Sequence, residues 1–537
     1  MKESLIEVIK NALREIGINE DVSIELNVPK QKENGDYSTN VAMKLASFAH
    51  DNPINLAQKI VKNINCPSIR NIEIKQPGFI NFFVTKDYII ANIKEVLIKK
   101  VEYGRSSIGN GKRINIEFVS ANPTGILHLG NARGGAYGDS LARIMRFCGY
   151  DVTEEYYIND AGNQINNLGE SIKARYYEIC GKDYGFPENG YHGKEIIDIA
   201  KEIYEEHKDT YLDQGIEYYK ELGTKKLLNR IIEDLKRYRI NYDVFTSEKD
   251  IAKRYDLNNL IQELTDNGYT YKQDGATWFK CSSIFDDKDH VLVKDDNSFT
   301  YLVPDIAYHK DKFDRGYSKL INLFGADHHG YIIRLKSAID ILGYDSKNLD
   351  VLIIQMVRLM ANGEELKMSK RTGNAITIRE LCEDVGVDAA RYFFLAKTLD
   401  SQFDFDLDVA RKNNSENPVY YIQYAYARMS SVLRKNNNYA IKDTYQLLNT
   451  EKELELIKVL AEFEKLVVDV AKSKEVHRIT SYAYKLANAF HSLYNESKFI
   501  DENNLELTGE RLALVKASSI VLKNALNLLG IEAKEVM

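Results

Sequence analysis

The chain has 537 residues, a formal net charge of −7 and five cysteines. At this length one hydrophobic core no longer keeps growing, so we expect a soluble protein of two to four domains. The cysteines are widely spaced without a Cys-x-x-Cys pair, which indicates neither a disulfide framework nor a zinc site and fits a reducing cytoplasm. We see no secretory leader and no apolar run long enough for a membrane span, and the acidic total argues against non-specific binding of DNA.

The first 100 residues are expected to form an N-terminal α+β domain. Ser4 and Glu7 have capping-box spacing ahead of an amphipathic helix, and Gly17 is placed to end that helix. Apolar and polar residues then alternate over residues 22–28, which predicts a strand with one buried face.

A strand, a glycine turn and a helix are predicted next. Residues 113–120 alternate as a strand on a core does, and a helical pattern begins near Gly130. Helix N-termini carry unpaired N–H groups and partial positive charge, which suit phosphate oxygens. Taken alone, such a turn is weak evidence, because His128 could equally be a satisfied core residue. The residues expected to contact a nucleotide are Pro123, Gly125, His128, Gly130 and Asn131.

The middle of the chain mixes helices with short apolar strands. Charged, tyrosine-rich helical stretches such as residues 195–236 indicate an insertion. Residues 320–324 and 351–354 are compact apolar runs of the length expected of buried parallel strands.

A loop with two lysines follows these strands. Two ammonium groups between Gly363 and Gly373 could close over a triphosphate, although a solvated basic loop is the plainer alternative. The sequence contains neither a Walker lysine loop nor a Gly-x-Gly-x-x-Gly fingerprint, so a nucleotide would be held in another way. The candidate ATP contacts in this loop are Lys367, Met368, Ser369 and Lys370.

From about residue 414 the pattern is helical to the end and predicts a bundle. Four tyrosines near its start are candidates either for the core or for stacking on nucleic-acid bases. Because they recur at helical spacing, we favour the core for most of them. They are Tyr420, Tyr421, Tyr424 and Tyr426.

The two candidate nucleotide segments resemble the signatures of class I aminoacyl-tRNA synthetases. His128–Asn131 is similar to the HIGH signature and Lys367–Arg371 to the KMSKS signature, with Asn131 in place of the usual second histidine. An amide can donate to a phosphate but cannot become cationic. Further stretches resemble arginyl-tRNA synthetases, namely residues 157–164, 191–193, 305–309, 325–328 and 417–425.

The resemblance implies a Rossmann-like catalytic domain with a parallel sheet, an N-terminal α+β domain and an all-α helical bundle. The N-terminal domain would contact the tRNA elbow, and the bundle would read the anticodon. The expected boundaries are 1–100 for the N-terminal domain, 101–385 for the catalytic domain with an insertion at about 165–260, 386–413 for a connecting stem and 414–537 for the bundle.

The resemblance also implies an arginine site. A guanidinium is best recognised by carboxylates that accept parallel N–H bonds. Tyr301 and Asp305 match the positions that bind the substrate side chain, and Glu117 and Asn122 match those at its α-amino group. Asp327 is a weaker candidate. A buried carboxylate without its guanidinium costs about 3 to 5 kcal/mol, which is the scale needed to reject uncharged amino acids.

The expected reaction has two steps and no protein nucleophile. The carboxylate of L-arginine attacks the α-phosphate of ATP, and the 3′-terminal adenosine of tRNA(Arg) then takes the arginyl group. His128, Asn131, Lys367 and Lys370, with Mg²⁺, would stabilise the first transition state. The resemblance adds that the first step needs bound tRNA. We expect a cytoplasmic monomer in translation, with no zinc and no membrane partner.

Three alternatives stay open on the sequence alone. A glutamate or glutamine synthetase would share both signatures but should place a cation where Asp305 stands. A dinucleotide-binding dehydrogenase would share only the Rossmann-like scaffold and lacks its fingerprint here. A non-catalytic tRNA-binding relative would keep the bundle and lose the signatures, and both signatures are present.

Overall fold

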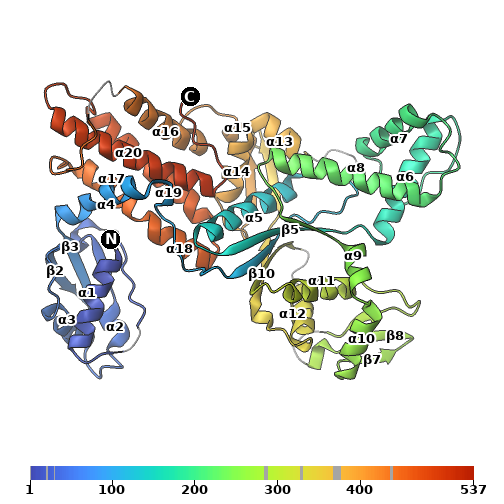
Figure 1. Cartoon of the computed structure of the whole chain (residues 1–537), viewed down its shortest axis with the longest axis horizontal. Coiled ribbons are helices and arrows are strands. Elements are labelled where there is room, and N and C mark those ends of the chain that lie inside the picture. Colours follow the sequence, from blue (N-terminus) through green and yellow to red (C-terminus); the bar gives the residue numbers. More distant parts are fainter. Residues whose placement is uncertain are drawn as a thin grey trace.

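The computed structural model describes residues 2–19, 22–29, 31–283, 288–326, 330–366, 376–435 and 440–537. Five candidate site residues lie outside these ranges, namely Asp327, Lys367, Met368, Ser369 and Lys370. The described chain forms an N-terminal module, a central region on a parallel sheet with a projecting lobe, and a helical bundle (Figure 1). The fold class predicted from the sequence is confirmed.

The N-terminal module packs its helices on a three-stranded sheet of order β1-β3-β2. Its middle strand β3 is the most buried of the three. Helix α4 leaves the module and packs against the bundle helices α17 and α20. The elements are α1 (Lys2–Glu15), β1 (Tyr37–Thr39), α2 (Val41–Leu45), α3 (Pro53–Lys62), β2 (Ile69–Lys75), β3 (Phe79–Val84) and α4 (Lys86–Lys99).

Two local predictions for this module were wrong and one was correct. Helix α1 already runs from Lys2, so Ser4 lies inside the helix and is not its cap. Residues 22–28 contain only an isolated bridge at Asn27, because no neighbouring strand continues the pairing there. Gly17 does end the helix, with a φ of +82° that glycine adopts without steric cost.

The central region is built on a five-stranded parallel sheet of order β11-β10-β4-β5-β6. Strand β4 lies in the middle and is buried on both faces, so Asn115 and Glu117 are buried as well as Ile114 and Ile116. The two apolar runs predicted as buried strands form β10 and β11. The strands are β4 (Arg113–Glu117), β5 (Asp151–Ile158), β6 (Val244–Ser247), β10 (Lys319–Gly325) and β11 (Leu349–Ile354).

Two separate hydrophobic clusters lie against this sheet. One contains α5, which follows β4, and the other contains α11 and α12. The site described below lies where β4, α5, α11 and β10 meet at the carboxyl edge of the sheet, the edge at which open α/β sheets bind ligands. The helices are α5 (Leu129–Phe147), α11 (Leu302–Asp314) and α12 (Tyr331–Ile341).

The lobe at one end of the molecule in Figure 1 spans residues 162–237, where the sequence predicts an insertion at about 165–260, and its helices have a hydrophobic core of their own. A second group of helices and a small antiparallel sheet of order β7-β8-β9 follow it. The lobe contains α6 (Gly162–Ile179), α7 (Lys194–His207) and α8 (Ile216–Arg237). The second group contains α9 (Glu248–Arg254), α10 (Leu257–Asp266), β7 (Thr270–Gln273), β8 (Ala276–Phe279) and β9 (His290–Val293).

The chain then passes through a third small sheet into the bundle. Strand β12 lies between β13 and β14 in this sheet, and α13 and α14 pack against α5. The elements before the bundle are β12 (Val357–Ala361), β13 (Glu364–Glu365), α13 (Ile378–Val385), α14 (Val387–Leu395), β14 (Phe403–Asp406) and α15 (Leu407–Ala410). The bundle contains α16 (Pro418–Arg434), α17 (Glu451–Ala461), α18 (Phe463–Ser473), α19 (His477–Glu496) and α20 (Leu505–Leu528).

Candidate active site

His128 lies where the chain enters α5 after β4, and it is the N-cap of that helix. Its Nδ1 accepts a hydrogen bond from the N–H of Gly130 at 3.3 Å, and the side-chain oxygen of Asn131 accepts one from the N–H of His128 at 3.1 Å. Because Nδ1 is an acceptor, the proton of the neutral ring is on Nε2, where it can be donated to a phosphate. Asn131 caps the helix with its oxygen and retains its amide group as a donor.

The chain returns to His128 just after the loop with the two lysines. Thr377 forms an antiparallel bridge with His128, and the N–H of Ile378 donates to the carbonyl oxygen of Leu127 at 3.0 Å. Lys367 to Lys370 lie outside the described residues. The described chain that resumes at residue 376 is anchored at the start of α5 by Thr377 and Ile378.

The turn between β4 and α5 has an unusual backbone. Val119 has a φ of +69° and Ser120 a φ of +36°, a region that β-branched residues rarely adopt. The Ser120 hydroxyl donates to Glu117 at 2.9 Å and accepts from the N–H of Tyr157 at 3.1 Å. Strained backbone held in this way is common at functional sites. After this turn come three predicted nucleotide contacts, namely Pro123, which is buried, Gly125, which is half-buried, and Gly130, which is exposed.

Asn122 joins this turn to the inserted lobe. Its side-chain amide donates to the side-chain oxygen of Gln164, in the first turn of α6, at 2.5 Å. The predicted α-amino contact is therefore positioned by the insertion as well as by the sheet.

Tyr301 and Asp305 lie at the start of α11. The Asp305 carboxylate accepts a hydrogen bond from the hydroxyl of Tyr331, lies 3.2 Å from Nδ1 of His309, and keeps 21% of its side chain exposed. Burial by itself raises the pKa of Asp305, but His309, Tyr331 and Lys312 outweigh burial and lower this pKa below its usual value. Tyr301 is 69% exposed, and its ring centroid lies 5.6 Å from that of Tyr331. An ionised carboxylate beside an aromatic ring suits a planar cation.

A chain of buried hydrogen bonds connects Glu117 to Asp305. The ammonium of Lys312 donates to Glu117 at 2.6 Å and to the side-chain oxygen of Asn322 at 3.3 Å. The amide nitrogen of Asn322 lies 2.6 Å from Nε2 of His309, and Nδ1 of His309 lies 2.8 Å from the carbonyl oxygen of Asp305. Lys312, Asn322 and His309 are fully buried. The sequence predictions gave these three residues no role. Two signals were present, since His309 lies in the family-like stretch 305–309 and Asn322 is a polar residue within an apolar strand.

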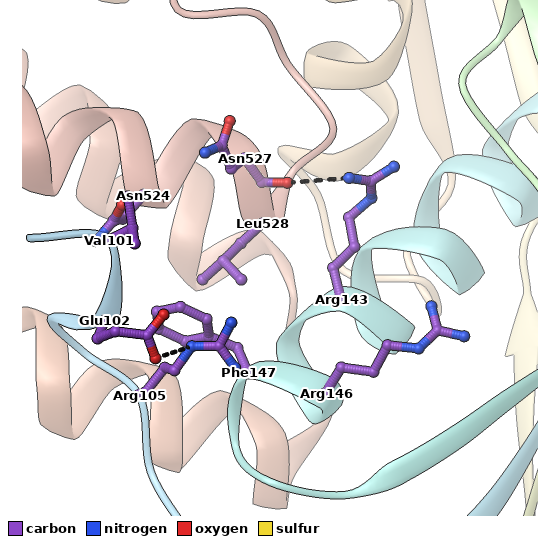
Figure 2. Close-up of a pocket in the computed structure, with 9 residues that line it drawn as sticks. All are labelled: Val101, Glu102, Arg105, Arg143, Arg146, Phe147, Asn524, Asn527 and Leu528. Atoms are coloured by element: carbon purple, nitrogen blue, oxygen red, sulfur yellow. Dashed lines mark hydrogen bonds and ion pairs between the residues drawn. The ribbon is translucent and has the colours of Figure 1, made fainter.

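A cavity of about 320 Å³ lies at the other end of α5, between that helix, the segment after α4 and the end of α20 (Figure 2). Three arginines line it, and each one is paired with a carboxylate. Because these partners neutralise the guanidinium charges, the cavity is not a strong anion site. The pairs are Arg105 with Glu102, Arg143 with Asp139, and Arg146 with Glu154 and Asp243.

The bundle carries an aromatic cluster on α16 and α19. Of the four tyrosines predicted mostly for the core, only Tyr426 is buried, and the other three are partly exposed. The rings of Tyr420 and Tyr424 stack with centroids 6.1 Å apart, and the guanidinium of Arg428 lies 4.4 Å from the centroid of Tyr424. Partly exposed rings beside a cation suit stacking on nucleic-acid bases.

Within the described ranges, no group of three or more His, Cys, Asp and Glu side chains is placed to hold a metal ion. In those same ranges, no helix combines the length and the apolar character needed to cross a membrane.

Family comparisons match this architecture region by region. The pattern described as "Arginyl tRNA synthetase N terminal domain" matches residues 3–84, "tRNA synthetases class I (R), catalytic domain" matches residues 92–442, and "DALR anticodon binding domain" matches residues 422–537. The catalytic pattern covers more than half of the chain and contains both signature regions.

Curated relatives match along the whole chain. An arginine–tRNA ligase of Geobacillus thermodenitrificans is 48% identical over 551 aligned positions, which cover 100% of this chain and 99% of the relative. That of Bacillus subtilis is 48% identical over 550 positions with the same coverage. The solved structure of Thermus thermophilus arginyl-tRNA synthetase has the same fold, with a TM-score of 0.79, 21% identity and 100% of both chains covered. The chain therefore belongs to the arginyl-tRNA synthetase family and is a class I aminoacyl-tRNA synthetase.

Proposed function

We propose how this synthetase attaches arginine to tRNA(Arg) at the carboxyl edge of its parallel sheet. An oxygen of the arginine carboxylate attacks the α-phosphorus of ATP, which forms arginyl-adenylate and releases pyrophosphate. The 3′-terminal ribose hydroxyl of the tRNA then attacks the arginyl carbonyl carbon, loses its proton and displaces AMP. Neither step needs a protein nucleophile, so positioning and electrostatics carry the rate.

The phosphates are placed at the start of α5. His128 donates from Nε2 and Asn131 from its side-chain amide, and the ammonium groups of Lys367 and Lys370 stabilise the charge that builds on pyrophosphate. The observation that carries this assignment is the pairing of Thr377 with His128, because it anchors the segment after the two lysines beside the helix N-terminus. The remaining ATP contacts are Pro123, Gly125, Gly130, Met368 and Ser369.

The arginine side chain is placed at the start of α11. Asp305 accepts the guanidinium N–H groups, Tyr301 covers the guanidinium plane, and Asp327 is a further acidic contact. At the other end of the substrate, Glu117 and Asn122 bind the α-ammonium group. The hydrogen-bonded chain from Glu117 to Asp305 supports this arrangement, since it makes both carboxylates parts of one site.

Magnesium bound to the phosphates of ATP would add to the stabilisation of the first transition state. Mg²⁺ usually binds through one or two carboxylates and substrate phosphates, and no protein ligand is assigned to it here.

The tRNA is held by regions far from the reacting atoms. Residues 1–100 contact its elbow, residues 386–413 form a stem, and residues 414–537 read the anticodon, with the partly exposed tyrosines of α16 stacking on bases. The enzyme acts as a monomer in the cytoplasm. Light scattering coupled to size exclusion tests the monomer, and a dimer mass would refute it.

ATP–pyrophosphate exchange with each of the twenty amino acids, with and without tRNA(Arg), tests the proposal. We expect exchange with arginine alone, and only when tRNA is present. Exchange with glutamate or glutamine would refute the arginine site, and equal exchange without tRNA would refute the coupling.

A further inference from the structure

The buried chain behind the arginine site contains one histidine whose protonation state follows from its neighbours. The Asn322 side-chain oxygen accepts from the ammonium of Lys312 at 3.3 Å. A lysine ammonium has only donors, so this contact fixes which end of the Asn322 amide faces Lys312. The amide nitrogen therefore faces His309, 2.6 Å from Nε2.

This orientation determines the tautomer of His309. Because the Asn322 amide nitrogen donates, Nε2 must be an acceptor and cannot carry a proton. The single ring proton is then on Nδ1, which lies 2.8 Å from the carbonyl oxygen of Asp305 and 3.2 Å from its carboxylate. An imidazolium would place the Nε2 proton against the Asn322 amide protons. Rotating the amide would only move the conflict to Lys312.

When His309 is neutral, the negative charge of the Asp305 carboxylate remains available to the substrate. Glu117 and Lys312 compensate each other as an ion pair at 2.6 Å, so the ionised carboxylate of Asp305 is the net charge of these residues. Arginine brings two cationic groups and one carboxylate, and hence one net positive charge. An imidazolium at His309 would cancel the charge of Asp305 before arginine arrived.

We infer that Lys312 and Asn322 are positioning residues that hold His309 as a neutral Nδ1–H donor, so that Asp305 keeps its full negative charge for a cationic substrate. This inference rests on the proposed role of Asp305 in arginine binding. The other titratable groups around the ring are Tyr308 and Lys312 on its own helix, Glu117 on β4 and Tyr331 on α12. The ring centroid of Tyr308 lies 5.5 Å from that of His309, and Tyr331 donates to the Asp305 carboxylate.

Nitrogen-15 NMR of histidine-labelled wild-type enzyme tests the tautomer directly. We expect His309, assigned by its loss in His309→Asn, to show a protonated Nδ1 and an unprotonated Nε2 at pH 7. A neutral Nε2–H ring, or an imidazolium at pH 7, would overturn the inference. This measurement needs no variant at Asn322, so it holds even where that variant fails to fold.

The variant Asn322→Asp tests the consequence. A carboxylate at this position accepts from both Lys312 and Nε2–H, so it favours the imidazolium form of His309. We expect a protonated His309 ring at pH 7 and an arginine KM raised about tenfold. The variant adds a negative carboxylate at position 322 and a positive imidazolium at His309, and the imidazolium lies nearer to the substrate guanidinium. The ATP KM and kcat should stay within about twofold, since the phosphate end is unchanged. A protonated ring with an unchanged arginine KM would contradict the inference.

Two further variants separate the effect of His309 protonation from the general effect of changing a buried asparagine to aspartate. Asn92→Asp makes the same isosteric change at another buried asparagine, which donates to Tyr103, and should leave the arginine KM unchanged. His309→Asn places a neutral amide nitrogen where Nδ1 was, and should raise the arginine KM less than Asn322→Asp does, because it brings no positive charge beside Asp305. Asp305→Asn must itself raise the arginine KM. If it does not, the proposed arginine site fails, whatever tautomer His309 adopts.

Discussion

Arg133, in the first turns of α5, donates from its guanidinium to the carbonyl oxygen of Gln355 at the end of β11, 2.8 Å away. The same guanidinium donates to the carbonyl oxygens of Thr398 and Ser401, at 2.7 and 3.0 Å. Arg133 is fully buried. One side chain thus fastens α5 to the segments that lead into the neighbouring strands β12 and β14 of the small sheet.

We predict that Arg133→Met destabilises this junction by about 3 kcal/mol, because three carbonyl oxygens lose their donor while the aliphatic part of the side chain is kept. Scanning calorimetry should show the first unfolding transition at a lower temperature. Arg358→Met is the control. Arg358 forms an exposed ion pair with Asp404, and such solvent-exposed pairs contribute little to stability. Equal shifts for the two variants would contradict the prediction.

The first signature yields a second prediction. His128→Ala should lower kcat for ATP–pyrophosphate exchange about 100-fold, because the Nε2–H donor to the phosphates is lost. Asn131→Asp separates the role of Asn131 in capping α5 from its role as a donor to the phosphates. Its oxygen can still accept from the N–H of His128, so the melting temperature should hold, while a negative oxygen replaces the amide donor and kcat falls. An undiminished rate in either variant would remove that residue from the phosphate site.

The aromatic cluster of the bundle yields a third prediction. Tyr424→Ala should raise the tRNA KM of aminoacylation about tenfold, because stacking on one base contributes roughly 1–3 kcal/mol. Tyr424→Phe keeps the ring and should behave like the wild type. Tyr426→Ala removes a buried ring instead, so it should lower the melting temperature. If Tyr424→Ala had the tRNA KM of the wild type, the anticodon would not bind at this aromatic cluster.

The sequence predicted correctly the elements that pack against apolar neighbours in the fold. The compact runs at residues 320–324 and 351–354 become adjacent parallel strands, and the helix after Gly130 forms as expected. Alternation at residues 22–28 was misleading, since a strand also needs a partner.

The interior of the candidate site could not be predicted in the same way. Lys312 and Asn322 belong to a helix and a strand, and only their packing brings the ammonium 3.3 Å from the amide oxygen. Periodicity predicts that such positions are apolar, because a buried charge is stable only with partners that the linear sequence does not reveal. The tyrosines of α16 show the converse, since helical spacing alone overestimated their burial.

The last prediction concerns pH and the end of the chain. Asp388, in the first turn of α14, accepts hydrogen bonds from the N–H of Glu532 at 3.0 Å, from Gln423 at 2.9 Å and from Arg239 at 2.5 Å. Burial alone raises the pKa of Asp388, but these three donors outweigh it and lower the pKa below its usual value. The carboxylate therefore stabilises the attachment of the final segment to the catalytic region.

The sign of the pH dependence follows from this lowered pKa. In the unfolded chain Asp388 titrates near about pH 4, so its stabilisation is complete above that pH and is lost as the pH falls through the lower folded-state value. We predict that Asp388→Asn costs about 2 kcal/mol at pH 7 and progressively less between about pH 5 and 3. Melting temperatures across this range test it, with Asp404→Asn, at an exposed pair, as the control that changes little. A gap between wild type and Asp388→Asn that stays constant down to about pH 3 would mean that the carboxylate charge does not hold the end of the chain.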